Sequence, residues 1–319
     1  MRFIPYDIFK LFYLQLSLVW NHKMNLLIKY LRQLRQSLNQ PGDYNYVSLK
    51  EMGNSIPKVI HQTYYKKDLS TELQNNVNQL KLMNPDWSYK IYDDNDIENY
   101  IKLHYPELVA IYYKINPIYG AARADFFRYL LIYNEGGVYL DIKSSITKPL
   151  DEIIKNDDVY LLSHWKNEAG EKHENAGLHH RIDNPYGEFQ QWHIVAAKGH
   201  PFLKAVINNV CHNIQTYNPF FNATGTWGVL TVTGPIAYTL AITPYLNEYP
   251  HRLERYSEDY NFVYSIFSEL HLHKHQILFK KHYSTLCDSI VKQSFLAHLI
   301  FKTVQPIKDK IFVLMRSFV

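Results

Sequence analysis

The segment 124–142, ADFFRYLLIYNEGGVYLDI, constrains the fold of this chain more than any other part of its sequence. Its first part predicts a helix that ends at Gly136 and Gly137, because helices commonly finish on a residue in the left-handed conformation. The β-branched and aromatic residues that follow predict a short buried strand, with Asp141 at its carboxyl end. This order is typical of α/β proteins, in which ligands bind at the carboxyl ends of the strands.

Charged and hydroxyl groups gather on one face of the predicted helix. Asp125, Arg128 and Tyr129 stand at positions i, i+3 and i+4, so they share that face. With Asp141 at the adjacent strand end, these groups suit the diphosphate and sugar of a nucleotide sugar. Each part also has a plainer interpretation, since a helical ion pair is commonly solvated and a Gly-Gly pair commonly only ends a helix. Their combination favours a functional site.

Helix and strand patterns alternate through the first half of the chain. The predicted elements are strands at 58–65, 88–92 and 138–142 and helices at 70–83, 94–104 and 120–134. This order predicts an α/β fold with a mostly parallel central sheet. Beyond residue 150 the pattern is irregular, and only 201–217 and 234–245 predict further helices.

The two ends of the chain are basic, although the whole chain carries a net charge of only +4. Residues 1–40 carry +5 and residues 292–319 carry +4, which leaves −5 on the rest. Apolar residues recur every three or four positions near both ends, so each end predicts a basic amphipathic helix. Such helices attract an anionic membrane surface, or else pack on the protein or a partner. The acidic body does not indicate a nucleic-acid binder, which needs a basic stripe on its folded domain.

These patterns divide the chain into a helical N-terminal segment at 1–50, a domain at 51–291 and a C-terminal helix at 292–319. The longest uncharged run near the N-terminus, residues 11–21, is too short to span a bilayer. No signal-peptide cleavage pattern follows it. Two cysteines give no disulfide framework and favour a reducing compartment. The expected location is therefore cytoplasmic, with peripheral contact at the inner membrane face.

The central segment follows the pattern R-x-D-x-x-R-Y, a spacer and G-G-x-Y-x-D. The residues that carry it are Arg123, Asp125, Arg128, Tyr129, Gly136, Gly137, Tyr139 and Asp141. The chain thereby resembles the sugar-binding region of glycosyltransferases with a DXD motif, family 32. That group includes fungal initiating mannosyltransferases and bacterial capsular sugar transferases, and the clostridial glucosylating toxins are similar at this segment. Weaker similarity extends from about residue 56 to about residue 286.

The resemblance implies a GT-A-like nucleotide-sugar-binding fold at 51–291, with terminal helices added to it. The implied activity is retaining transfer of a hexose from a UDP- or GDP-linked sugar to a glycan or glycolipid acceptor in surface polysaccharide synthesis. Two alternatives stay open. One is a toxin-like glycosyltransferase that acts on a protein, and the other is an inactive nucleotide- or glycan-binding scaffold of a polysaccharide synthesis complex.

The resemblance also implies roles for individual residues. Asp125 would bind hydroxyls of the donor sugar with Arg128 beside it, and Asp141 would lie near the ribose and a metal ion. The other donor-binding residues of the motif are Tyr129, Gly136, Gly137 and Tyr139.

Polar residues outside the central segment are further candidates. His61, Gln62 and Thr63 follow the first predicted strand, where a nucleotide base and ribose are expected in this architecture. Ordinary loop polarity is the alternative. The stretch 190–193 offers groups for sugar hydroxyls or an acceptor. The stretch 233–235 opens a helix whose N–H groups suit a diphosphate or an acceptor hydroxyl, although helix initiation alone explains it as well.

Lys143 departs from the family pattern, because it stands where the family has the second acid that ligates Mn²⁺ or Mg²⁺. A protonated ammonium has no free lone pair and cannot be a ligand. Three accounts stay open. Asp141 holds the metal with distant oxygen or histidine ligands, Lys143 itself supplies positive charge to the diphosphate, or the site is inactive. His282 is the preferred additional metal ligand, because members of the family often place a histidine and a serine near the donor.

Overall fold

The computed structural model describes residues 44–218, 222–267 and 283–293. The predicted terminal helices, apart from residues 44–50 and 292–293, and the predicted metal ligand His282 lie outside these residues. Residues 44–50 have no regular secondary structure and pack on the domain, with Tyr46 N and Val47 N bonded to Asn208 Oδ1. Within the described residues, no helix is both long enough and apolar enough to cross a bilayer.

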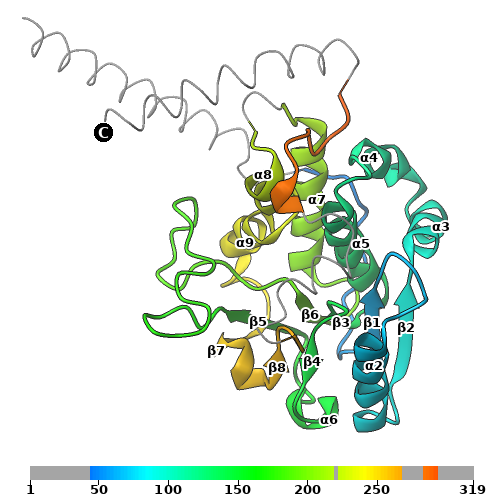
Figure 1. The fold of residues 1–319 in the computed structure, drawn as a ribbon, viewed down its shortest axis with the longest axis vertical. Helices are drawn as coiled ribbons and strands as arrows, with labels where there is room; N and C mark the ends of the chain where they lie inside the picture. The colour runs from blue at the N-terminus through cyan, green and yellow to red at the C-terminus, as the bar shows by residue number, and fades with distance from the viewer. Residues whose placement is uncertain (1–43, 219–221, 268–282, 294–319) are drawn as a thin grey trace, which may run out of the picture. The chain divides into compact units, whose positions relative to one another are not determined.

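A six-stranded sheet runs through the described domain in the order β2-β1-β3-β6-β5-β7 (Figure 1). Its strands are β1 (Val59–Thr63), β2 (Ser88–Tyr92), β3 (Gly137–Leu140), β5 (Tyr160–His164), β6 (His193–Ala196) and β7 (Arg252–Tyr256). β6 runs antiparallel to both of its neighbours, whereas the other neighbouring strands run parallel. A separate small sheet pairs β4 (Ser145–Ile146) with β8 (Phe262–Val263). The predicted α/β fold with a mostly parallel central sheet is therefore confirmed.

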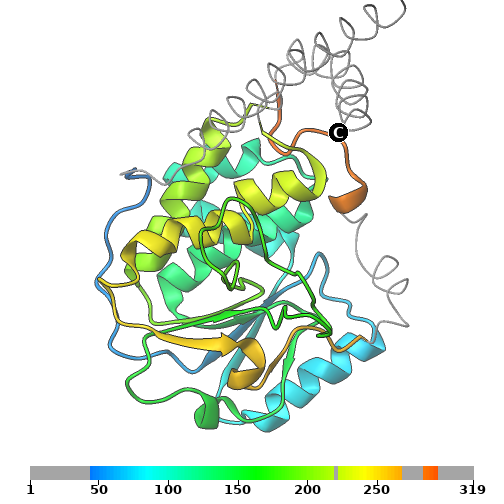
Figure 2. The same ribbon diagram turned by 90° about the vertical axis from the view of Figure 1, so that its left-hand side faces the viewer.

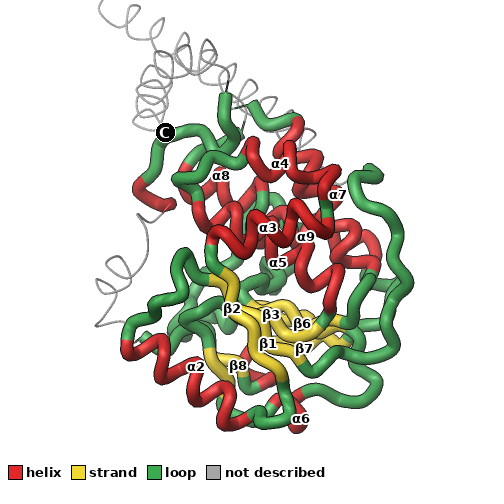
Figure 3. The backbone as a smooth tube through the Cα atoms, turned by 90° about the vertical axis from the view of Figure 1, so that its right-hand side faces the viewer, coloured by secondary structure: helices red, strands yellow, loops and turns green. Residues whose placement is uncertain are grey.

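Helices cover both faces of the large sheet, as Figures 1 and 3 show. One face carries α3 (Asp94–His104), α4 (Val109–Lys114), α5 (Gly120–Glu135), α7 (Pro201–Gln215), α8 (Gly225–Val232) and α9 (Pro235–Ile242). The other carries α2 (Thr71–Met83) and α6 (Leu150–Ile153). Side chains alternate along β3 accordingly, since Tyr139 joins the core under α5 while Val138 and Leu140 join the core above α2 and α6.

Local sequence signals explain the helix boundaries. The Ser70 side chain accepts a bond from Leu73 N at the start of α2, and Asp93 and Asp96 form a reciprocal capping box at the start of α3. α5 ends at Gly136, whose φ of 70° is accessible to glycine at little steric cost. The predicted helices at 70–83, 94–104 and 120–134 agree with these elements within one residue.

The irregular region after residue 150 contains strands that the sequence pattern did not predict. β5 and β6 are buried at every position, so neither has the alternation of apolar and polar residues that marks a half-exposed strand. Between them, residues 165–192 form a long connection that runs beside α8 and α9 (Figures 1 and 2). Because β6 is antiparallel, this connection leaves and rejoins the sheet at one edge, the edge at which β1 and β3 end.

Candidate active site

Arg128 of α5 joins two carboxylates at the carboxyl edge of the sheet. Its Nη2 lies 3.3 Å from Asp125 Oδ1 on the same helix, and its Nη1 lies 3.1 Å from Asp141 Oδ1 just beyond β3. Asp125 and Arg128 are almost completely buried, whereas the Asp141 side chain is 26% exposed. Asp141 is therefore the member of this cluster that is open to a ligand.

Asp125 is held by residues from two distant segments. Gln191 Nε2 donates to Asp125 Oδ1 at 3.1 Å, and Thr233 Oγ1 donates to Asp125 Oδ2 at 2.9 Å. Burial raises the pKa of Asp125, although the charge of Arg128 and these two hydrogen bonds oppose that shift. Tyr129 ties the same segments together, because its hydroxyl donates to the Thr233 carbonyl at 2.8 Å and lies 3.1 Å from Gln191 Oε1.

The guanidinium of Arg128 remains charged in this buried position. Burial lowers its pKa, but the negative charge of Asp141 and the neighbouring Tyr139 and Asp125 outweigh burial and raise the pKa above its ordinary value. Arg128 Nη1 also donates to the Gln191 carbonyl at 2.9 Å. A buried cation between two carboxylates is fixed in orientation, because each partner constrains it from a different element.

Tyr139 connects the cluster to β1. Its ring lies under the Arg128 guanidinium, 4.6 Å from centroid to Cζ, and its hydroxyl donates to Asp141 Oδ1 at 3.2 Å. The same hydroxyl lies 2.8 Å from Thr63 Oγ1. Gln62 Nε2 donates to the Asp141 carbonyl at 3.2 Å. The ends of β1 and β3 therefore position Asp141 through both its side chain and its backbone.

The structure buries His61, whose contact with a nucleotide base stays a prediction. His61 lies within β1 rather than after it, is fully buried, and places Nδ1 3.1 Å from Tyr92 Oη. Burial lowers its pKa to about 4, so the ring is neutral at ordinary pH. Gln62 and Thr63, which stand nearer the carboxyl end of β1, reach Asp141 and its partners, whereas His61 lies deeper along the strand.

Gly136 and Gly137 are also placed away from the cluster. Gly137 begins β3, about 13 Å from Asp141 at the usual rise per strand residue, and Gly136 precedes it at the end of α5. A Cβ on Gly137 would come within 2.6 Å of Val59 Cγ1, and one on Gly136 within 2.7 Å of Lys198 N. Close backbone packing accounts for both glycines, and their contact with the donor stays a prediction.

Lys143 lies in the turn that follows Asp141, which Ser144 N closes by donating to the Asp141 carbonyl at 2.7 Å. Its Nζ donates to Tyr264 Oη at 2.7 Å and lies 3.9 Å from the centroid of that ring. No sequence pattern points to Tyr264, which follows β8 and approaches Lys143 through the tertiary fold. A partly exposed ammonium is thus held two residues from the open carboxylate.

The described residues offer a divalent cation few protein ligands. Within residues 44–218, 222–267 and 283–293, no group of three or more His, Cys, Asp or Glu side chains is placed to hold a metal. Both oxygens of Asp125 already accept hydrogen bonds. Mg²⁺ in proteins commonly binds through one or two carboxylates together with water and substrate phosphate. The site therefore fits a cation held by Asp141 alone among these residues, completed by a diphosphate and water.

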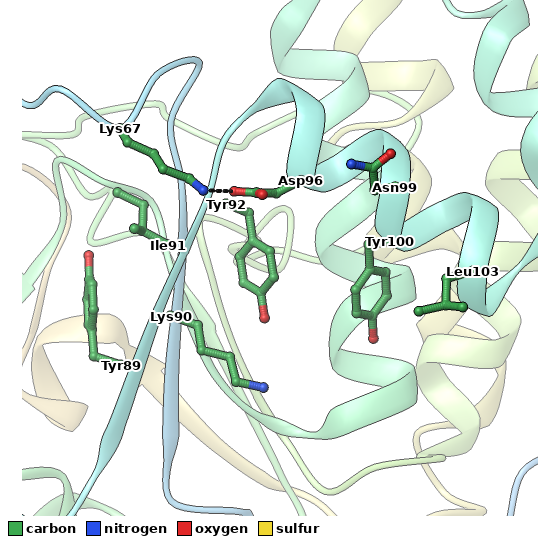
Figure 4. Close-up of a pocket in the computed structure, with 9 residues that line it drawn as sticks. All are labelled: Lys67, Tyr89, Lys90, Ile91, Tyr92, Asp96, Asn99, Tyr100 and Leu103. Atoms are coloured by element: carbon green, nitrogen blue, oxygen red, sulfur yellow. Dashed lines mark ion pairs between the residues drawn. The ribbon is translucent and has the colours of Figure 1, made fainter.

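A surface pocket lies between the edge strand β2 and α3 (Figure 4). Its lining residues are Lys67, Tyr89, Lys90, Ile91, Tyr92, Asp96, Asn99, Tyr100 and Leu103. The Lys67–Asp96 ion pair, with 2.8 Å between Nζ and Oδ2, stands at its rim. None of these residues belongs to the Arg128 cluster, so this pocket is separate from the candidate active site.

Comparison with known proteins relates the segment that carries the Arg128 cluster to a described protein family. The family described as glycosyltransferase sugar-binding region containing DXD motif matches residues 70–160, which include α5, β3 and Asp141. This region of the chain is that of a glycosyltransferase. Residues 70–160 thus match the DXD-motif region that the sequence pattern resembles, and they depart from its motif at Lys143.

Curated relatives carry the names of mannosyltransferases. The chain is 30% identical over 180 residues to an initiation-specific alpha-1,6-mannosyltransferase of Candida albicans, which covers 51% of this chain and 45% of the relative. It is 28% identical over 120 residues to a mannosyl phosphorylinositol ceramide synthase of Saccharomyces cerevisiae, covering 38% of this chain and 31% of the relative. The chain thus spans less than half the length of these relatives.

Solved structures with a similar fold are toxin domains. The PaToxG glycosyltransferase matches with a TM-score of 0.43 and 17% identity, covering 69% of this chain and 77% of that chain. The UDP-bound glycosyltransferase domain from the YGT toxin matches with a TM-score of 0.38 and 8% identity, covering 68% and 83%.

Proposed function

We propose that this protein is a retaining hexosyltransferase, which moves a hexose from a UDP- or GDP-linked sugar to a glycan or glycolipid. The observation that carries the proposal is the Arg128 guanidinium fixed between Asp125 and Asp141 at the carboxyl edge of the sheet. Relatives named as mannosyltransferases support mannose as the first donor sugar to test. A surface polysaccharide is the acceptor that we propose from the sequence pattern.

Asp125 and Arg128 are proposed to orient the donor sugar. Asp125 Oδ1 accepts from Gln191 and faces Arg128, whereas Oδ2 accepts from Thr233 and retains a lone pair for a sugar hydroxyl. Because Gln191 and Thr233 hold the carboxylate in place before the donor arrives, little reorganisation is needed when the sugar binds. Asp141, being partly exposed, is the residue proposed to meet the ribose and diphosphate end.

The transfer step needs no dedicated protein base. The bond between the anomeric carbon and the diphosphate oxygen breaks, and the acceptor hydroxyl oxygen bonds to that carbon from the same face. The acceptor proton passes to a diphosphate oxygen, and the nucleoside diphosphate leaves. Stabilising the developing charge on the diphosphate is expected to be the largest catalytic contribution.

Lys143 is proposed to supply part of that stabilisation. Its ammonium lies in the turn after Asp141 and is oriented by Tyr264, so it is placed to meet a diphosphate at the sheet edge. A divalent cation, when bound at Asp141, would add positive charge to the same leaving group. The structural position of Lys143 supports a phosphate contact because lysine binds phosphate as a point charge.

The test is hydrolysis of a panel of UDP- and GDP-hexoses by the full chain, in Mn²⁺ and in EDTA, with Lys143→Asp as the partner variant. Turnover in EDTA that Lys143→Asp abolishes supports the proposal for Lys143. Turnover that requires Mn²⁺ in both proteins would mean that a metal ion at Asp141, rather than Lys143, stabilises the charge on the diphosphate. Nucleotide binding without any turnover, with or without a mannoside acceptor, contradicts the enzyme and favours a scaffold.

The proposed location is cytoplasmic with peripheral membrane contact, supported by the basic ends of the chain. Residues 301–319 carry part of that charge. Deleting them should weaken binding to vesicles that contain anionic lipid, more at low than at high salt. Unchanged binding would contradict the membrane role.

A further inference from the structure

The connection between β5 and β6 builds a preorganised surface beside the cluster. Glu188 N donates to the Gly177 carbonyl at 2.9 Å, which folds residues 177–188 back on themselves. Gly187 has a φ of 79°, and a Cβ there would lie 2.5 Å from the Gly177 carbonyl oxygen. Residue 177 and residues 187–188 are therefore in close backbone contact, as a fixed binding surface requires.

A buried carboxylate fixes the side chains of this surface. Glu188 accepts from Trp165 Nε1 at 2.9 Å on one oxygen, and its other oxygen lies 2.7 Å from His179 Nε2. The Glu188 side chain is buried and both of its oxygens are engaged. The indole and imidazole rings are consequently held in one orientation relative to each other.

Trp227 of α8 presents its indole to solvent next to this histidine. The His179 ring meets it edge to face, with 5.4 Å between the ring centroids and 73° between the planes. The side chain of Trp227 is 47% exposed, whereas the other tryptophans among the described residues are buried or half-buried. An exposed indole with a polar ring at its edge offers both an apolar face and a hydrogen-bonding group.

Two links connect this surface with the Arg128 cluster. Trp165 contacts Tyr264 with 4.9 Å between ring centroids, and Tyr264 holds Lys143. In the other direction, Trp227 lies on the helix that leads to Thr233, which donates to Asp125. These links connect Trp227 and His179 to the segments that hold Lys143 and Asp125.

We propose that Trp227 and His179 form a subsite for a sugar ring of the acceptor. The apolar face of the ring would stack on the indole, and a ring hydroxyl would bond to the imidazole that Glu188 orients. This inference rests on the proposed sugar transfer, because it assigns the acceptor side of the same site. It commits to a carbohydrate acceptor rather than to a protein acceptor.

A binding measurement tests the subsite independently of turnover. Saturation-transfer NMR with α-1,6-mannobiose compares the full chain with Trp227→Ala and Trp227→Phe. Tyr186→Ala is the matched control, because Tyr186 is an aromatic residue of the same connection that is 49% exposed but packs on Arg255, with 4.2 Å from Cζ to the ring centroid. We expect Trp227→Ala to abolish saturation transfer, and Trp227→Phe and Tyr186→Ala to retain it.

Kinetics separate this inference from the proposed function. We expect transfer to the mannobiose to fall at least about tenfold relative to donor hydrolysis in Trp227→Ala, and also in His179→Ala. Mannobiose binding that depends on Trp227, in a protein that turns over no donor, would uphold the subsite and contradict the enzyme. Equal binding by Trp227→Ala and Tyr186→Ala, or no binding by the unaltered protein, would overturn the subsite.

Discussion

Arg128 Nη1 and Asp141 Oδ1 lie 3.1 Å apart and join the middle of α5 to the end of β3. This ion pair makes the helix and the strand end one charged unit, because Arg128 also holds Asp125 through its other nitrogen. The pair has one buried partner and one partly exposed partner. Such an arrangement keeps the cation in place while leaving a carboxylate edge open to a ligand.

The buried carboxylate is expected to be indispensable for turnover. In Asp125→Asn, the amide replaces an oxygen that accepts from Gln191 or Thr233 and weakens the attraction to Arg128. We expect a loss of turnover of about 10²-fold or more and a loss of stability of about 1–3 kcal/mol. Turnover assays and thermal denaturation measure the two effects. Asp86→Asn, at an exposed aspartate, is the control; equal turnover in the two variants would contradict the site assignment.

The hydroxyl of Tyr139 is expected to orient Asp141. Tyr139→Phe removes the bonds to Asp141 and Thr63, at a cost of about 1 kcal/mol in the free energy of unfolding. Because Asp141 also loses a fixed donor, donor hydrolysis should fall. Tyr92→Phe removes a comparable contact, with His61, and should lower stability without that fall in hydrolysis. Equal hydrolysis in both variants would remove Tyr139 from the site.

Gly137 is expected to be required by packing as well as by backbone conformation. Gly137→Ala places a methyl group within 2.6 Å of Val59 Cγ1 at a φ of 100°. Gly170→Ala has a similar φ of 84° but nothing within 4 Å of its Cβ. We expect the first change to lower the free energy of unfolding by about 3 kcal/mol and the second by about 1 kcal/mol, measured by urea denaturation. Equal losses would mean that conformation alone selects glycine.

Stability should fall in acid because four histidines are buried in the neutral form. Burial lowers the pKa to about 4 for His61, His164 and His200 and to about 3 for His193. Between an unfolded pKa of about 6.5 and these folded values, the unfolded state binds more protons. Stability is therefore fully present above about pH 6.5 and is lost as the pH falls through that window, by up to about 1.4 kcal/mol per pH unit for each histidine.

Denaturation at several pH values between about 7.5 and 4.5 checks this dependence. His200→Asn is the variant of choice, since asparagine also caps a helix and His200 Nδ1 accepts from Phe202 N at the start of α7. As the pH falls, the free energy of unfolding of this variant should decline less steeply than that of the unaltered protein. The difference should equal the contribution of one histidine. An unchanged slope would show that His200 does not contribute to the pH dependence.

The sequence determined the local elements of this protein. Ser70, Asp93 and Gly136 mark helix ends through hydrogen bonds and backbone angles that depend only on neighbouring residues, and α2, α3 and α5 follow them. The spacing of Asp125 and Arg128 likewise fixed their common face, because helical geometry is independent of the rest of the chain.

Only the tertiary structure decided which distant groups complete the site. Gln191, Thr233 and Tyr264 reach the cluster from segments far along the chain, and no periodic pattern encodes such contacts. The structure also turned His61 into the core and placed Gly137 at the far end of β3, although both stand in the sequence beside site residues. Local propensity defines what each segment becomes, whereas long-range packing defines which side chains meet.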